Sequence, residues 1–120
     1  MHNLLLLNRD EGPFVVNTLE HIFRTVKEFR NLRFDEPGGS ILEVQFVERD
    51  GSTFVRLNDS GKSVSVSGTS DVSLRAAMIV QEHLQTPLRI VDTEYSFDLI
   101  LADFANLQEL QNAIKEAQSS

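Results

Sequence analysis

Residues 41–67 read ILEVQFVERDGSTFVRLNDSGKSVSVS, and the pattern of this stretch decides the fold. Apolar and polar residues alternate in three short runs, residues 42–46, 53–57 and 63–67, as expected of strands that bury one face. The pair Asp50-Gly51, between the first two runs, is favoured in tight hairpins. Because parallel neighbours would need a long crossover, these short connections predict an antiparallel meander of three strands.

A helix is predicted before the meander, from Thr18 to Arg30. Its apolar residues recur at steps of three and four and therefore share one helical stripe: Leu19, Ile22, Phe23, Val26 and Phe29. Asn17 and Glu20 have the spacing of a capping box at its start. Residues 35–40, which include a Pro-Gly pair, form a loop between this helix and the meander.

Two further helices are predicted after the meander. Thr69 or Ser70 is the expected N-cap of the first, which ends before the Thr-Pro pair at residues 86–87. Asn106 and Glu109 repeat the capping-box spacing at the start of the second.

Two β segments complete the pattern. Residues 4–7 indicate a short buried strand, whose place at the edge or the centre of the sheet the sequence leaves open. Residues 88–101 indicate a β segment that is either continuous or broken at Asp92. The order β-α-β-β-β-α-β-α predicts one α+β domain over residues 1–120, a two-layer sandwich with three helices on one face of a mostly antiparallel sheet.

The other face of the sheet is predicted to be wet, polar and acidic. This expectation follows from strand alternation, which sends successive side chains to opposite faces. The residues expected there are Glu43, Gln45, Ser63, Ser65, Ser67, Asp92, Glu94, Ser96 and Asp98.

The composition favours an intracellular protein. A chain of 120 residues can bury about two-thirds of its unfolded surface without help from a disulfide or a metal. The absence of cysteine favours a reducing compartment. The longest apolar run, residues 4–7, is far shorter than the roughly 20 residues of a membrane span. We therefore expect a cytoplasmic protein that does not contact membranes.

The charge balance argues against nucleic-acid binding. The chain has 11 Lys+Arg against 18 Asp+Glu, a formal net charge of −7. Nucleic-acid binders show the opposite balance, because phosphate attraction supplies much of their affinity. An acidic domain would associate faster with a basic partner, although acidity also serves solubility alone.

The sequence shows no pattern that marks a catalytic, cofactor or metal site. The histidines His2, His21 and His83 are far apart in the chain, and no two have the spacing of helical metal ligands. Asp92, Glu94 and Asp98 would share one side of an extended strand, but strand-spaced acids usually form a hydrated face. We therefore expect no enzyme, no cofactor and no bound metal.

Residues 67–77 (SGTSDVSLRAA) and 87–99 (PLRIVDTEYSFDL) resemble a group of small bacterial immunity proteins. These proteins accompany polymorphic toxins, including those of contact-dependent growth-inhibition systems. The resemblance extends over roughly the last 55 residues, and over the first half only in general layout. It implies a function: binding a cognate toxin domain in the cytosol and covering its active site.

The resemblance also implies a partner, the C-terminal domain of a large secreted toxin, often a basic nuclease. Acidic residues would then face the lysines and arginines that hold nucleic-acid phosphates. The candidate contacts are Asp92, Glu94, Asp98 and Glu43, with Tyr95 as an aromatic anchor unless it points into the core.

Two other functions remain open at this level. The chain could be a homo-oligomeric subunit or regulatory module without catalytic activity, for instance a homodimer; whether the chain is a monomer or a homodimer stays open. It could also be a small enzyme with a dispersed site, for which a pocket uniting His21 or His83 with carboxylates would be the sign.

Overall fold

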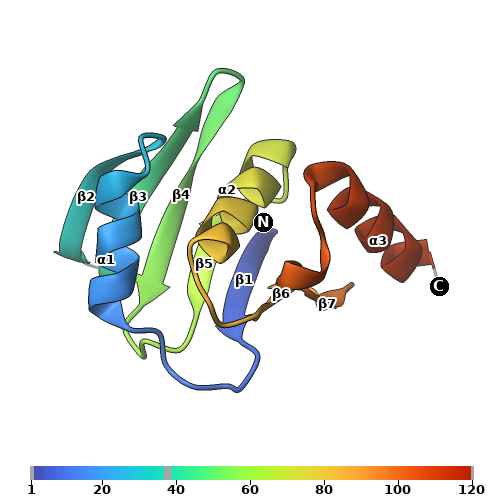
Figure 1. The fold of residues 1–120 in the computed structure, drawn as a ribbon, viewed down its shortest axis with the longest axis horizontal. Helices are drawn as coiled ribbons and strands as arrows, with labels where there is room; N and C mark the ends of the chain where they lie inside the picture. The colour runs from blue at the N-terminus through green and yellow to red at the C-terminus, as the bar shows by residue number, and fades with distance from the viewer. Residues whose placement is uncertain (1, 37–38, 120) are drawn as a thin grey trace.

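The computed structural model describes residues 2–36 and 39–119, and within them seven strands form one sheet (Figure 1). In chain order the strands are β1 (Asn3–Asn8), β2 (Phe29–Glu36), β3 (Ser40–Glu48), β4 (Gly51–Asn58), β5 (Val64–Ser67), β6 (Leu88–Asp92) and β7 (Asp98–Ile100). The helices are α1 (Val16–Thr25), α2 (Asp71–Glu82), the short 3-10 helix η1 (Leu101–Asp103) and α3 (Leu107–Ser119). The predicted α+β class and order of elements are confirmed, with β2 added before the meander and the last β segment divided into β6 and β7.

The sheet has the strand order β2-β3-β4-β5-β1-β6-β7, and every neighbouring pair is antiparallel. The first strand therefore lies inside the sheet, between β5 and β6. Leu4 and Leu6 of this strand are opposite Val66 and Val64 on one side, and opposite Asp92 and Ile90 on the other. This register places the side chains of Leu4, Ile90 and Asp92 on the same face.

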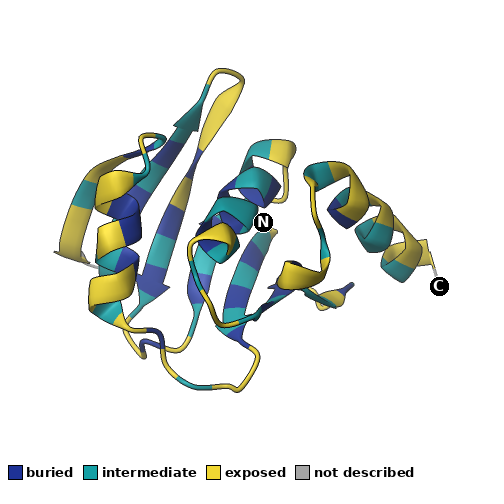
Figure 2. Ribbon diagram, viewed as in Figure 1, coloured by how far each residue is buried: buried dark blue, intermediate teal, exposed yellow. Residues whose placement is uncertain are grey.

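The core lies between that face and the helices. Buried and partly exposed residues alternate along β1, β3, β4 and β5, and the helices turn their buried stripes towards the same layer (Figure 2). Helix α1 contributes Leu19, Ile22 and Phe23, and α3 contributes Leu110. Each fully buried leucine or phenylalanine stabilises the fold by about 1.5–3 kcal/mol. We call the uncovered side of the sheet the open face.

The prediction of a helix over residues 18–30 is wrong at both ends. Helix α1 spans Val16–Thr25, so Asn17 lies within the helix, and the N-cap residue Val15 makes no side-chain cap. The chain turns after Val26 and enters β2 at Phe29. The ring of Phe29 still packs in the core, with its centroid 5.0 Å from that of Phe23, which explains why it fitted the helical stripe.

The other predicted helix starts are confirmed. Ser70 is the N-cap residue of α2, although its side chain makes no capping hydrogen bond. The Asn106 side chain accepts a hydrogen bond from the Glu109 amide at 3.0 Å, and the Glu109 carboxylate accepts one from the Ala105 amide at 3.0 Å. The first bond satisfies an amide group that the first turn of α3 leaves without a helical partner, and the second ties the residue before the N-cap to the helix.

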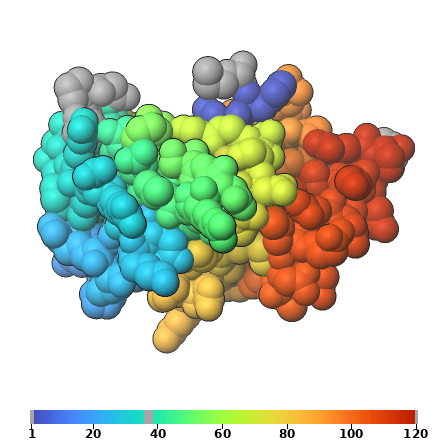
Figure 3. All heavy atoms as spheres, turned by 90° about the horizontal axis from the view of Figure 1, so that it is seen from above, coloured from blue at the N-terminus to red at the C-terminus, as the bar shows by residue number. Residues whose placement is uncertain are grey.

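Two regions form opposite ends of the molecule. Figure 3 shows α1 and β2 (blue to cyan) at one end and α3 (red) at the other, with α2 and the β3–β4 hairpin (green) between them. Within the described residues, no helix has the length and apolar character that a membrane crossing requires.

Candidate functional site

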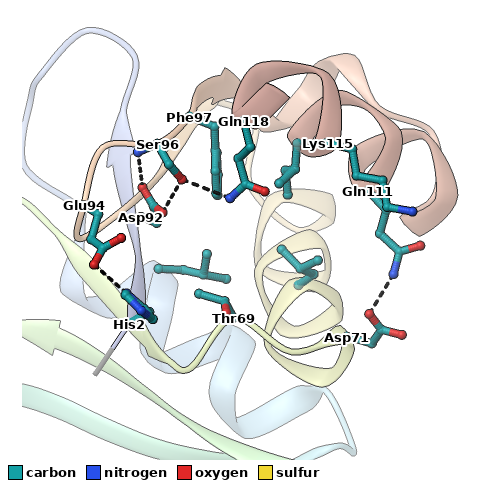
Figure 4. Close-up of a pocket in the computed structure, with 13 residues that line it drawn as sticks. His2, Thr69, Asp71, Asp92, Glu94, Ser96, Phe97, Gln111, Lys115 and Gln118 are labelled. Carbon is teal, nitrogen blue, oxygen red and sulfur yellow. Dashed lines mark hydrogen bonds and ion pairs between the residues drawn. The ribbon is translucent and has the colours of Figure 1, made fainter. Parts of the chain in front are cut away.

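A cleft of about 580 Å³ opens between α2, α3 and the turn that joins β6 to β7 (Figure 4). The buried apolar residues of its lining, Leu4, Leu74 and Phe97, form its floor. Its polar residues include three carboxylates and one ammonium group, those of Asp71, Asp92, Glu94 and Lys115. We call this feature the acidic cleft.

Asp92 does not lie on the open face, and the prediction that placed it there is wrong. It is the last residue of β6, faces the helices and is only 5% exposed. Its Oδ1 accepts a hydrogen bond from the Ser96 amide at 2.7 Å, and its Oδ2 accepts one from the Ser96 hydroxyl at 2.5 Å. Asp92 therefore closes the turn over residues 92–96, and both of its oxygens have partners inside the protein.

Hydrogen bonds from three elements hold this turn. The Thr93 amide donates to the Asn3 carbonyl of β1 at 3.0 Å, and the Tyr95 amide donates to the Asp92 carbonyl at 3.0 Å. From α3, the Gln118 amide group donates to the Ser96 hydroxyl at 3.0 Å. A loop with bonds to β1, β6 and α3 is fixed in place before any partner arrives.

Tyr95 projects from this turn into solvent. Tyr95 is 71% exposed, whereas the nearby Phe97 is buried. The structure thus places Tyr95 outside the core, which removes the objection to its role as an anchor. Its φ of 55° lies in the left-handed region, which costs an L-residue roughly 1–2 kcal/mol.

Glu94 and Asp71 stand on the exposed part of the cleft. Glu94 Oε1 lies 3.3 Å from His2 Nδ1, and both side chains are mostly exposed. Asp71 accepts a hydrogen bond from the Gln111 side chain at 2.7 Å, which joins the start of α2 to α3. Sequence reasoning missed Asp71, Gln111 and Gln118, because nothing in the local pattern indicates that α3 packs beside this turn.

Asp98 and Glu43 lie away from the cleft, on the open face. Asp98 receives two hydrogen bonds from Arg89, from Nε at 3.2 Å and from Nη2 at 2.5 Å. These bonds and the Asp98 charge raise the pKa of the Arg89 guanidinium above its usual value, so it remains protonated. Glu43 forms an ion pair of 2.6 Å with Arg56. The predicted contact residues are therefore divided between two faces.

The open face is not acidic, contrary to the prediction. The strand register places four arginines and three carboxylates on it, counting only strand residues whose side chains the structure describes. They are Arg30, Arg33, Arg56, Arg89, Asp35, Glu43 and Asp98. The continuous strand assumed for residues 92–98 does not exist, because residues 93–97 form the turn.

The histidines were a second possible site. His21 lies on α1 outside both regions described above. His83 lines another hollow together with Asp10, but its Nδ1 lies 3.0 Å from the Ile79 carbonyl, and Asp10 accepts a hydrogen bond from the Gly12 amide. Among residues 2–36 and 39–119, no group of three or more histidine, cysteine, aspartate or glutamate residues is arranged to hold a metal ion.

Comparisons of the chain with protein-family models, with curated proteins and with solved structures give no match.

Proposed function

We propose that this protein is an immunity protein, which binds a basic toxin domain through the 92–96 turn and the acidic cleft beside it. The observation that carries the proposal is the exposed Tyr95, held in a left-handed conformation by a turn that three elements fix. The proposal draws the kind of partner from the family resemblance and the place of contact from this geometry.

The turn has the properties of a binding anchor. Tyrosine is enriched among the residues that contribute most to protein interfaces, because it buries a large area at little conformational cost. Strained backbone tends to occur where a side chain must be presented in one particular direction. Asp92 and Gln118 fix the turn in the free protein, so binding loses little entropy there.

The charges beside Tyr95 favour a basic partner. Glu94 is exposed, and Asp71 leaves one carboxylate oxygen without a partner among the described residues. Residues 64–120, which build α2, α3 and the turn, contain three basic residues against eight acidic ones. A field of this sign raises the association rate with lysine- or arginine-rich surfaces. A nuclease that is covered at its phosphate-binding residues loses access to its substrate.

Binding to the C-terminal domain of the protein that the adjacent gene encodes tests the proposal. With both proteins purified, we expect Tyr95→Ala to weaken binding at least about thirtyfold, the loss of an interface anchor. Glu94→Lys is expected to slow association several-fold at low salt, and less at high salt. Phe34→Ala is the matched control, because Phe34 is also an exposed aromatic residue but lies on β2.

Two outcomes would contradict the proposal at different levels. If the unaltered protein neither binds that toxin domain nor protects cells from it, the immunity function is wrong. If binding occurs but Tyr95→Ala and Phe34→Ala behave alike, the function stands and the assigned contact surface is wrong.

A further inference from the structure

The open face carries a second feature, a groove of about 330 Å³ across β2, β3 and β4. Its lining includes Asn31, Arg33, Glu43, Gln45, Phe54 and Arg56. We call it the arginine groove. We propose that it is a docking site for an acidic segment of a protein, in which a glutamate or aspartate side chain binds Arg56. This inference is independent of the function proposed above, because it concerns the opposite face of the sheet.

Arg56 is held in a fixed position. Its Nε donates to Glu43 Oε1 at 2.6 Å, and its Nη1 donates to the Ser67 hydroxyl at 3.1 Å. Its guanidinium carbon lies 5.3 Å from the ring centroid of Phe54. These contacts leave Nη2 without a hydrogen-bond partner within the described residues. A planar guanidinium fixed in this way matches the geometry of an incoming carboxylate.

The walls of the groove suit a short peptide. Phe54 is 42% exposed, so its ring offers an apolar surface beside the guanidinium. The Asn31 amide group donates to Gln45 Oε1 at 3.2 Å, which leaves the Gln45 amide hydrogens available for a ligand. Arg33 lies opposite Glu43 in the strand register.

The charge distribution favours a protein carboxylate over nucleic acid. Four arginines against three carboxylates give the strands of the open face a slightly positive balance in a protein whose formal net charge is −7. A nucleic acid carries a charge at every phosphate and would meet both Glu43 and the field of the whole protein. A segment with one or two carboxylates instead responds mainly to the charges of the groove itself, because salt screens the more distant negative charges of the protein.

Titration of the full chain with a short, end-blocked peptide that carries two glutamates tests the inference. The readout is the backbone and arginine Nε resonances by NMR at physiological ionic strength, where distant charges are screened. We expect saturable shifts at Gln45, Phe54 and Arg56, and Arg56→Gln is expected to weaken binding about tenfold. Glu43→Gln removes the competing internal carboxylate and is expected to strengthen binding several-fold. If the ion pair between Glu43 and Arg56 only stabilised the fold, Glu43→Gln would not strengthen binding.

The chain offers a matched control in Arg24→Gln. Arg24 is also paired with a glutamate, Glu20, at 2.8 Å and also lies over an exposed phenylalanine, Phe34, at 5.5 Å. Binding should be unchanged in this variant. Free glutamate and a short oligothymidylate are the competitors. If either shifts the same resonances at lower concentration than the peptide, or if Glu43→Gln fails to strengthen peptide binding, the inference is wrong.

Discussion

The acidic cleft and the arginine groove lie on opposite faces of one sheet, and their charges are satisfied in different ways. In the cleft, Asp92 and Asp71 accept hydrogen bonds from the neutral groups of Ser96 and Gln111. In the groove, Arg56 is paired directly with the opposite charge of Glu43. Neutral partners fix a charge without cancelling it, whereas an ion pair removes most of its long-range field. The cleft is thus suited to attract a partner over distance, and the groove to select one by geometry.

The largest expected effect tests whether the cleft is held by Asp92. Asp92→Ala leaves the partly buried amide and hydroxyl of Ser96 without their charged acceptor, and should lower the free energy of unfolding by about 2 kcal/mol. Glu94→Ala, two residues away and exposed, should change it by less than about 0.5 kcal/mol. Urea unfolding measures both. Equal effects would show that the turn does not depend on Asp92.

The buried position of Asp92 also shows where sequence reasoning fails. The alternation along residues 88–98 fits a strand, but the chain turns at Thr93, and this places Asp92 and Asp98 on opposite faces. The turn depends on Asn3 and Gln118, which are far away in the sequence. Local pattern alone therefore could not separate a buried capping carboxylate from an exposed one.

Strand β2 was missed for a related reason. It contains a bulge between Arg30 and Arg33, and Asn31 has a left-handed φ of 59°, so the period of two is broken. By contrast, the meander and the N-cap positions of Ser70 and Asn106 were predicted, because each depends on residues that are close together in the chain. The arginine groove requires β2, so it could not have been predicted without this strand.

A second, smaller effect compares the two arginines that lie over phenylalanine rings. Arg56→Ala removes a half-buried ion pair, a bond to Ser67 and a contact with Phe54, and should cost about 1–1.5 kcal/mol. Arg24→Ala removes an exposed pair within one helix and should cost about 0.3–0.5 kcal/mol. Thermal unfolding of both variants measures the difference. Similar costs would mean that Arg56 is no better fixed than a surface arginine.

The smallest effect compares the two left-handed residues, Tyr95 beside the cleft and Asn31 in the groove. Glycine adopts this conformation freely, so Tyr95→Gly should raise the free energy of unfolding by about 0.5 kcal/mol, after the entropy cost of glycine. Asn31→Gly should give no gain, because asparagine tolerates this conformation and its bond to Gln45 is lost. Urea unfolding of both variants, measured in the same experiment, compares these two changes in the free energy of unfolding.

A gain in stability at Tyr95 combined with a loss of toxin binding would mean that the residue is kept at this position for recognition, at the expense of the fold. If Tyr95→Gly instead lowered the free energy of unfolding, the tyrosine would stabilise its own turn, as Asp92 does. Tyr95 would then have a structural role, and the binding anchor beside the cleft would be another residue, with Glu94 as the nearest exposed candidate. The contrast between cleft and groove would then rest on charge alone, because neither site would retain a residue held under strain.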